Sequence, residues 1–175
     1  MKLQELMHLK GMQAFLRERL GNAIQVSHVK AAKRLPDYLV LLVSLQGTDQ
    51  RLVVKAAGPL ATLSSQFERT AALHTLVARQ TSIRMPEIFV ADVSQRVYPW
   101  RYLVKAYLPG VSLAQARSKM SSTEIANAFE QLGKAVGDLH QVQFPAFGEL
   151  DSDLQLTLAL NFLPALRARA ELVIT

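Results

Sequence analysis

The chain has 175 residues, a length that suits one domain, or one domain and part of a second. Hydrophobic residues make up 50%, so a packed core is feasible, and the lack of cysteine excludes disulfides and thiolate metal sites. The net charge of +6 raises a nucleic-acid hypothesis, but the basic residues do not interleave with aromatic ones, which favours solvated basic faces. No apolar run reaches the roughly 18–20 residues of a membrane span, and the N-terminus is charged throughout, so a cytoplasmic protein without membrane contact is expected.

Residues 1–21 predict an amphipathic helix that ends near Gly21, because apolar side chains recur at helical spacing from Leu3 onward. Such a helix could lie on a membrane surface, but packing on the domain's own core is favoured.

Residues 22–57 change to the pattern typical of strands. The segment "AIQVSHVKA" alternates, "DYLVLLVSLQ" has the length of a buried strand, and "GTDQ" turns the chain into "RLVVKAA". Three consecutive antiparallel strands are therefore expected.

A helix and two further strands follow. The segment "SSQFERTAALHTLVARQ" predicts a helix, in which Ser65 and Glu68 have the spacing of a capping box. Pro86 introduces a fourth strand, "EIFVADV", and the fifth strand, "RYLVKAYL", ends at Pro109-Gly110.

From residue 110 the pattern becomes helical, and the change of composition at Pro109-Gly110 is the predicted domain boundary. Residues 112–119 predict a short helix, and a capping box of Ser121 and Glu124 opens a longer one over about 122–140. The last part is left open, because "LQLTLAL" alternates like a strand whereas "FLPALRARAEL" resembles a helix.

This order of elements resembles the small lobe of a kinase-like fold. The segments "RLVVKAA", "YLVKAYLPGVSL" and "LGKAVGDLHQ…FPAFGEL" resemble the third-strand lysine motif, the hinge and the first large-lobe helix of the aminoglycoside phosphotransferase-like family, over about residues 22–150. The expected fold is α+β. A small lobe with a five-stranded antiparallel sheet and one helix would span residues 22–109, and the linker and first helices of an incomplete large lobe would span 110–175.

The resemblance implies a site for ATP and Mg²⁺ in the small lobe. Lys55 would contact the α- and β-phosphates, since phosphoryl transfer depends on positioning and charge stabilisation. Glu68 is the only acid of its helix and the candidate partner of the Lys55 ammonium, although matching the leucines to the family's helix puts the expected glutamate nearer Arg69. The backbone around Ala106 and Leu108 would receive the adenine ring.

The sequence departs from the family's pattern at two places. Lys105 stands where an apolar residue is usual and Ala106 where an acid is usual, and a lysine in an adenine pocket would be costly to desolvate. The segment between the first two strands, "AAKRLPDY", contains no glycine to cover phosphates, and its Lys33 and Arg34 could substitute.

The letters "GDLH" at residues 137–140 resemble a kinase catalytic loop, but the surrounding positions do not follow it. Valine, valine and glutamine stand where the family's loop has histidine, glycine and asparagine. Apolar residues also follow one face of a helix here: Phe129, Leu132, Val136 and Leu139. Asp138 is therefore predicted on a helix surface, and no catalytic or metal-binding residue is assigned.

The function expected is that of the nucleotide-binding half of an ATP-dependent small-molecule phosphotransferase. It would be inactive alone, because the catalytic loop and metal-binding aspartate would follow residue 175. The acceptor substrate is not indicated. The alternative is a non-enzymatic partner-binding or regulatory module, with a homo-oligomer or protein partner on an uncovered apolar face. The sequence leaves open a shortened reading frame, a deliberately shortened chain or a reduced relative.

Overall fold

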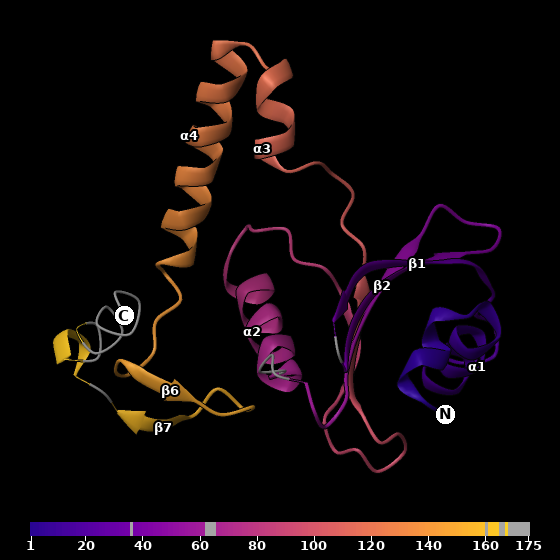
Figure 1. Cartoon of the computed structure of the whole chain (residues 1–175). Helices are drawn as coiled ribbons and strands as arrows, with labels where there is room; N and C mark the ends of the chain where they lie inside the picture. The colour runs from indigo at the N-terminus through magenta and orange to yellow at the C-terminus, as the bar shows by residue number, and fades with distance from the viewer. Residues whose placement is uncertain (36, 62–65, 160, 165–166, 168–175) are drawn as a thin grey trace.

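A five-stranded antiparallel sheet organises the computed structural model, which describes residues 1–35, 37–61, 66–159, 161–164 and 167 (Figure 1). Its strands are β1 (Val26–Leu35), β2 (Tyr38–Leu45), β3 (Arg51–Ala57), β4 (Ile88–Asp92) and β5 (Arg101–Ala106), in the order β1-β2-β3-β5-β4. Helix α2 (Phe67–Gln80) connects β3 to β4. The predicted succession of three strands, a helix and two strands is confirmed.

The N-terminal segment covers one face of this sheet. A 3-10 helix, η1 (Leu3–Met7), and helix α1 (Leu9–Leu20) pack there against alternate side chains of the central strands. The core includes four aromatic rings with centroids 4.6–6.1 Å apart, namely Phe15, Tyr98, Trp100 and Tyr102. The N-terminal helix therefore packs on the protein's own core, as favoured.

The single N-terminal helix that was predicted is, however, divided. His8 is extended (φ −99°, ψ 142°), and the chain folds back there, so that η1 lies against α1. The contact is close because Gly11 has no side chain: a Cβ atom on it would lie 2.1 Å from the carbonyl oxygen of Glu5. Periodicity alone did not indicate this break. Helix α1 ends at Gly21 (φ 106°), as predicted.

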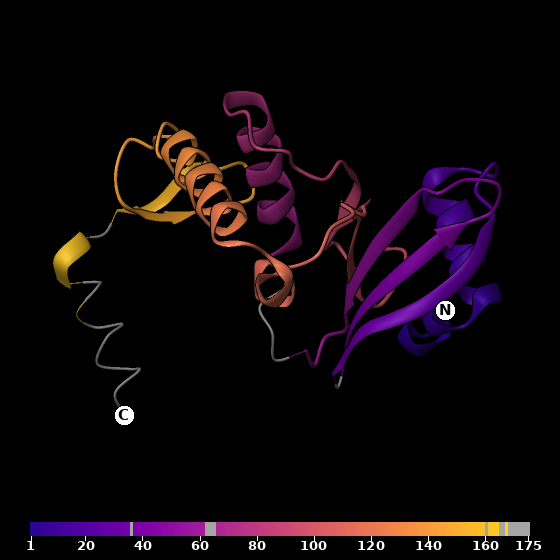
Figure 2. The ribbon, with the colours of Figure 1, turned by 90° about the horizontal axis from the view of Figure 1, so that it is seen from above.

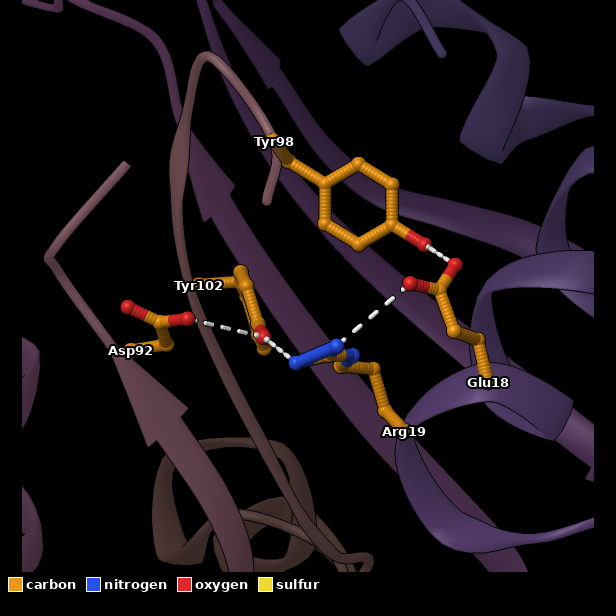
Figure 3. A network of polar contacts seen from close by, with 5 residues as sticks. All are labelled: Glu18, Arg19, Asp92, Tyr98 and Tyr102. Atoms are coloured by element: carbon orange, nitrogen blue, oxygen red, sulfur yellow. Dashed lines mark hydrogen bonds and ion pairs between the residues drawn. The ribbon is translucent and has the colours of Figure 1, made fainter. Parts of the chain in front are cut away.

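A polar network fixes α1 to the sheet (Figure 3). Arg19 donates a hydrogen bond to the Tyr102 hydroxyl (3.1 Å), which donates to Asp92 (3.2 Å), and the Tyr98 hydroxyl donates to Glu18. Burial, and then the charge of Asp92, raise the pKa of Tyr102 to about 12, so its hydroxyl remains a donor at neutral pH. This face of the sheet is therefore closed by both apolar and polar contacts.

The opposite face carries α2, which packs against β4 and β5. Only a small cluster, Ala57, Phe67 and Leu103, is buried there. Several other side chains on this face of β2, β3 and β5 are half-buried: Val40, Leu42, Val53, Lys55 and Lys105. We call this surface the open face.

The C-terminal elements are α3 (Leu113–Ala116), the 3-10 helix η2 (Arg117–Lys119), α4 (Ser122–Leu139), β6 (Gly148–Leu150) and β7 (Leu156–Ala159). Of these, α4, β6 and β7 lie beyond α2, on the side away from the sheet (Figure 2). The capping box of Ser121 and Glu124 is confirmed, and Ser112 with Gln115 forms a second one that the sequence analysis missed.

Three expectations about element boundaries need correction or lie outside the described residues. Strand β1 extends to Leu35, so Lys33 and Arg34 lie in a strand and not in a loop. The strand alternative for "LQLTLAL" is confirmed at β7, but its partner β6 was not predicted, so helices are not the only elements after residue 110. Ser65 and most of "FLPALRARAEL" lie outside the described residues, and α2 has no side-chain cap at Gln66.

Within the described residues, no helix is long and apolar enough to cross a membrane.

Candidate functional site

The candidate site lies on the open face, where Lys55 occupies the middle of β3. Lys55 pairs with Val40 of β2 and with Leu103 of β5, and Val40 pairs in turn with Lys33 of β1. Directly paired residues share a face of a sheet, so Lys33 and Lys55 lie in one row, two strand spacings or about 10 Å apart. The predicted residues Lys33 and Lys55 therefore come to the same surface.

A second lysine stands beside Lys55 on this face. Lys105 pairs with Val53, which is two residues from Lys55, so both side chains project to the same side of the sheet. Residues in this diagonal relation have Cα atoms about 7–8 Å apart. The departure from the family's pattern at residue 105 therefore places an additional charge next to Lys55.

His74 of α2 completes a group that we call the basic cluster, which consists of Lys55, Lys105 and His74. Burial and then the Lys55 charge lower the pKa of Lys105, and burial followed by the charges of Lys105 and Lys55 lowers the pKa of His74. The Nδ1 atom of His74 is buried without a hydrogen-bond partner. No ion pair joins these residues to an acid in the described part of the chain. The cluster is therefore suited to an anion.

Glu68 does not lie within ion-pair distance of Lys55. It stands in the first turn of α2 and lines a cavity of about 610 Å³ together with Arg69 and Arg101. The alternative position, Arg69, donates a hydrogen bond from Nη1 to the carbonyl oxygen of Leu150 (2.8 Å) and so links α2 to β6. Neither helix position therefore supplies an acidic partner to the basic cluster.

At the end of β5 and in the linker that follows, two backbone N–H groups are bound within the protein, and a third is not. The Ala106 N–H donates to the carbonyl of Glu87 (2.8 Å), and the Tyr107 N–H donates to that of Arg51 (2.9 Å). The Leu108 N–H donates to no backbone carbonyl of the described residues. Of the two predicted base-binding positions, only Leu108 therefore retains a backbone donor for a ligand.

Asp138 lies in the last turn of helix α4, as predicted, and not in a catalytic loop. It accepts a hydrogen bond from the Ser82 hydroxyl (2.5 Å), which connects the segment after α2 to the end of α4. Over the same described residues, no group of three or more His, Cys, Asp or Glu side chains could hold a metal ion.

Asp37, which the sequence analysis did not single out, fixes the turn between β1 and β2. Its carboxylate accepts the N–H of Leu60 (2.5 Å), and its carbonyl accepts the N–H of Gly58 (2.8 Å). A Cβ atom on Gly58 would lie 1.9 Å from this carboxylate, so the contact requires a glycine. The turn is thereby held near the end of β3, three residues beyond Lys55.

The sheet order, the helix between the third and fourth strands and the third-strand lysine together define the small lobe of a kinase-like fold. The family model of the phosphotransferase enzyme family matches residues 33–173, and the chain belongs to this family. No curated protein matches its sequence.

Two of the matching solved structures illustrate the shared fold. One is a candidate fructosamine-3-kinase from Thermobifida fusca YX-ER1, with a TM-score of 0.56 and 19% identity over 91% of this chain and 54% of the other. The other is a candidate fructosamine-3-kinase from Haemophilus somnus 129PT, with a TM-score of 0.51 and 19% identity over 82% of this chain and 43% of the other. The chain thus spans about half the length of these proteins, and the expected α+β kinase-like fold is confirmed.

Proposed function

We propose that the chain is the nucleotide-binding half of a small-molecule phosphotransferase that uses a purine nucleoside triphosphate, for which the resemblance implies ATP. The observation that carries this proposal is Lys55, a half-buried cation in the middle of β3 without an acidic partner among the described residues. Phosphoryl transfer needs a fixed cation where charge develops on the phosphates. Lys33, in the same row, provides a second cation for the triphosphate.

The residues of the open face fit a nucleotide in this orientation. Lys55, with Lys33 in the same row, would receive the phosphates, the apolar side chains of Val40 and Leu103 would contact the base, and the Leu108 N–H would donate to it. Magnesium, when bound, would neutralise phosphate charge. No acidic set for it occurs in the described part of the chain, so the ion would be held mainly by the phosphates.

We propose further that these 175 residues transfer no phosphoryl group by themselves. The one aspartate with a catalytic-loop sequence context, Asp138, belongs to a helix and is engaged by Ser82. A small-molecule hydroxyl would therefore lack the base that accepts its proton. The complete reaction, in the cytoplasm, would need a segment that supplies this base.

Titration calorimetry with ATP and MgCl2 tests the nucleotide site. We expect binding by the chain, and a loss of affinity of about tenfold or more in Lys55→Ala, because a charge-assisted contact to phosphate is lost. Lys10→Ala is the matched control, since Lys10 is exposed on α1, behind the closed face. Absence of binding, or equal binding by Lys55→Ala, would refute the proposal. Turnover that depends on Lys55 would refute the proposed inactivity.

A second candidate function is that of a partner-binding or regulatory module, which the exposed apolar stripe of α4 favours. Four apolar residues on one helical face are between 42% and 55% exposed: Phe129, Leu132, Val136 and Leu139. An uncovered stripe of this kind is typical of an interaction site. We expect self-association in sedimentation experiments to be abolished by Phe129→Glu but kept in Gln131→Glu, which adds the same charge to an exposed neighbouring position. A monomer at every concentration would argue against this role in self-association.

A further inference from the structure

Lys105 has donors that the protein does not satisfy. An ammonium group carries three N–H donors and no acceptor. Lys105 is half-buried, its nearest charged groups are Lys55 and His74, and it forms neither a hydrogen bond nor an ion pair with any described residue. Keeping such a group partly out of water is unfavourable unless an acceptor reaches it. The Lys105 nitrogen is not among the buried unpaired atoms, so water still reaches it, and an acceptor on a ligand would take the place of that water.

The strand register indicates which part of a nucleotide would reach Lys105. Lys105 directly precedes Ala106 and the linker, whereas Lys55 lies two positions farther from the linker along the sheet. In the proposed orientation the phosphates lie at Lys55 and the base lies at the linker. Lys105 would then face the edge of the base and not the phosphates, a conclusion that rests on the proposed function.

The two purines differ at the edge that Lys105 would meet. Adenine presents an amino donor at C6, whereas guanine and hypoxanthine present an oxygen acceptor there. An ammonium opposite an amino group leaves both donors unsatisfied, but opposite O6 it forms a charge-assisted hydrogen bond. The Leu108 N–H gives no preference where it donates to N7, an acceptor that both purines present.

We infer that the site prefers a 6-oxopurine nucleotide, of the guanine type, over an adenine nucleotide, and that Lys105 determines this specificity. Sites that read a base edge through a fixed donor discriminate strongly, because the wrong base leaves the donor unpaired. The lysine that departs from the usual adenine hinge is, in this view, the residue that selects a different base.

The test compares GTP, ITP and ATP, each with Mg²⁺, in calorimetric titrations of the 175-residue chain. We expect GTP and ITP to bind about tenfold or more tightly than ATP, as a base-edge contact implies. ITP has the 6-oxygen but not the 2-amino group of GTP, so equal binding of ITP and GTP assigns the preference to the 6-oxo edge that they share and not to the 2-amino group. Lys105→Met should abolish the preference, and Lys105→Arg, which keeps the donors, should retain it.

The outcomes separate this inference from the proposed function. Equal affinity of the unaltered chain for ATP and GTP overturns the inference alone. An equal loss of affinity for all three nucleotides in Lys105→Met also overturns the inference, because such a loss indicates that the lysine contacts the phosphates and not the base. If no nucleotide binds, or if binding is unaffected by Lys55→Ala, the proposed function fails and this inference with it.

Discussion

Lys105 should lower the stability of the folded chain, because a residue kept for binding is not optimised for folding. Burial and the neighbouring Lys55 depress its pKa, so the charged form is less favourable in the folded than in the unfolded state at neutral pH. We expect Lys105→Met to raise stability. Because the side chain is only half-buried, solvent screens the repulsion and the gain should be about 0.5–1 kcal/mol, or a Tm increase of about 1–4 °C.

Thermal denaturation measures this effect, with Lys10→Met as the control for removal of an exposed lysine. A Tm that falls in Lys105→Met, or rises no more than in the control, would contradict the description of Lys105 as an unfavourably placed charge.

His74 should make stability depend on pH. Its folded pKa lies below the usual 6.5, mainly through burial and then through Lys105 and Lys55, so the unfolded chain binds the proton more readily. The stability it contributes is complete above pH 6.5 and is lost as the pH falls toward the folded pKa. We expect Tm to decrease between about pH 7.5 and 5.5 in the parent chain and to decrease less in His74→Gln. The same decrease in His74→Gln as in the exposed-site control His140→Gln would exclude this role.

Single residues show where sequence analysis succeeds and where it ends. Lys55 could be placed because the strand pattern around it is regular and the motif is local. The partnership of Asp37 with Gly58, and that of Ser82 with Asp138, join positions 21 and 56 residues apart, and no periodicity connects them. Glu68 was assigned by residue type alone, since side-chain direction at the start of a helix depends on packing.

At the scale of elements, substitution of alanine for either of two glycines is expected to change stability in opposite directions. A Cβ atom at Gly11 would meet the Glu5 carbonyl at 2.1 Å, so Gly11→Ala should displace η1 and cost about 1–3 kcal/mol in thermal denaturation. A Cβ atom at Gly133 of α4 meets nothing within 4 Å, so Gly133→Ala should stabilise that helix by about 0.5–1 kcal/mol, measured by hydrogen exchange. A Gly11→Ala protein as stable as the parent would show that η1 does not lie against α1.

The elements that sequence could predict are those with enough residues for periodicity and a recognisable cap. Helix α4 has 18 residues and the box of Ser121 and Glu124, and its predicted start is within one residue of the observed one. Strand β6 has three residues, too few for alternation to be seen, and it exists because β7 pairs with it. The break at His8 depends on the close contact at Gly11, which a helical pattern does not reveal.

At the scale of the whole molecule, the two faces of the sheet differ in a way that suggests their roles. The face under α1 is sealed by aromatic packing and by the network around Arg19. The open face carries lysines from β1, β3 and β5, and His74 from α2, without acidic partners among the described residues. Stability therefore resides mainly on the first face, and the second is available for a ligand.

Hydrogen–deuterium exchange of the 175-residue chain, with and without magnesium and a purine nucleoside triphosphate, tests the proposed nucleotide site most directly. We predict slower exchange with nucleotide in residues 53–57 of β3 and in residues 105–110, which comprise the end of β5 and the linker, and no change in α1. Unchanged exchange in both segments, or protection confined to α4 or to the cavity beside Arg69, would contradict the account.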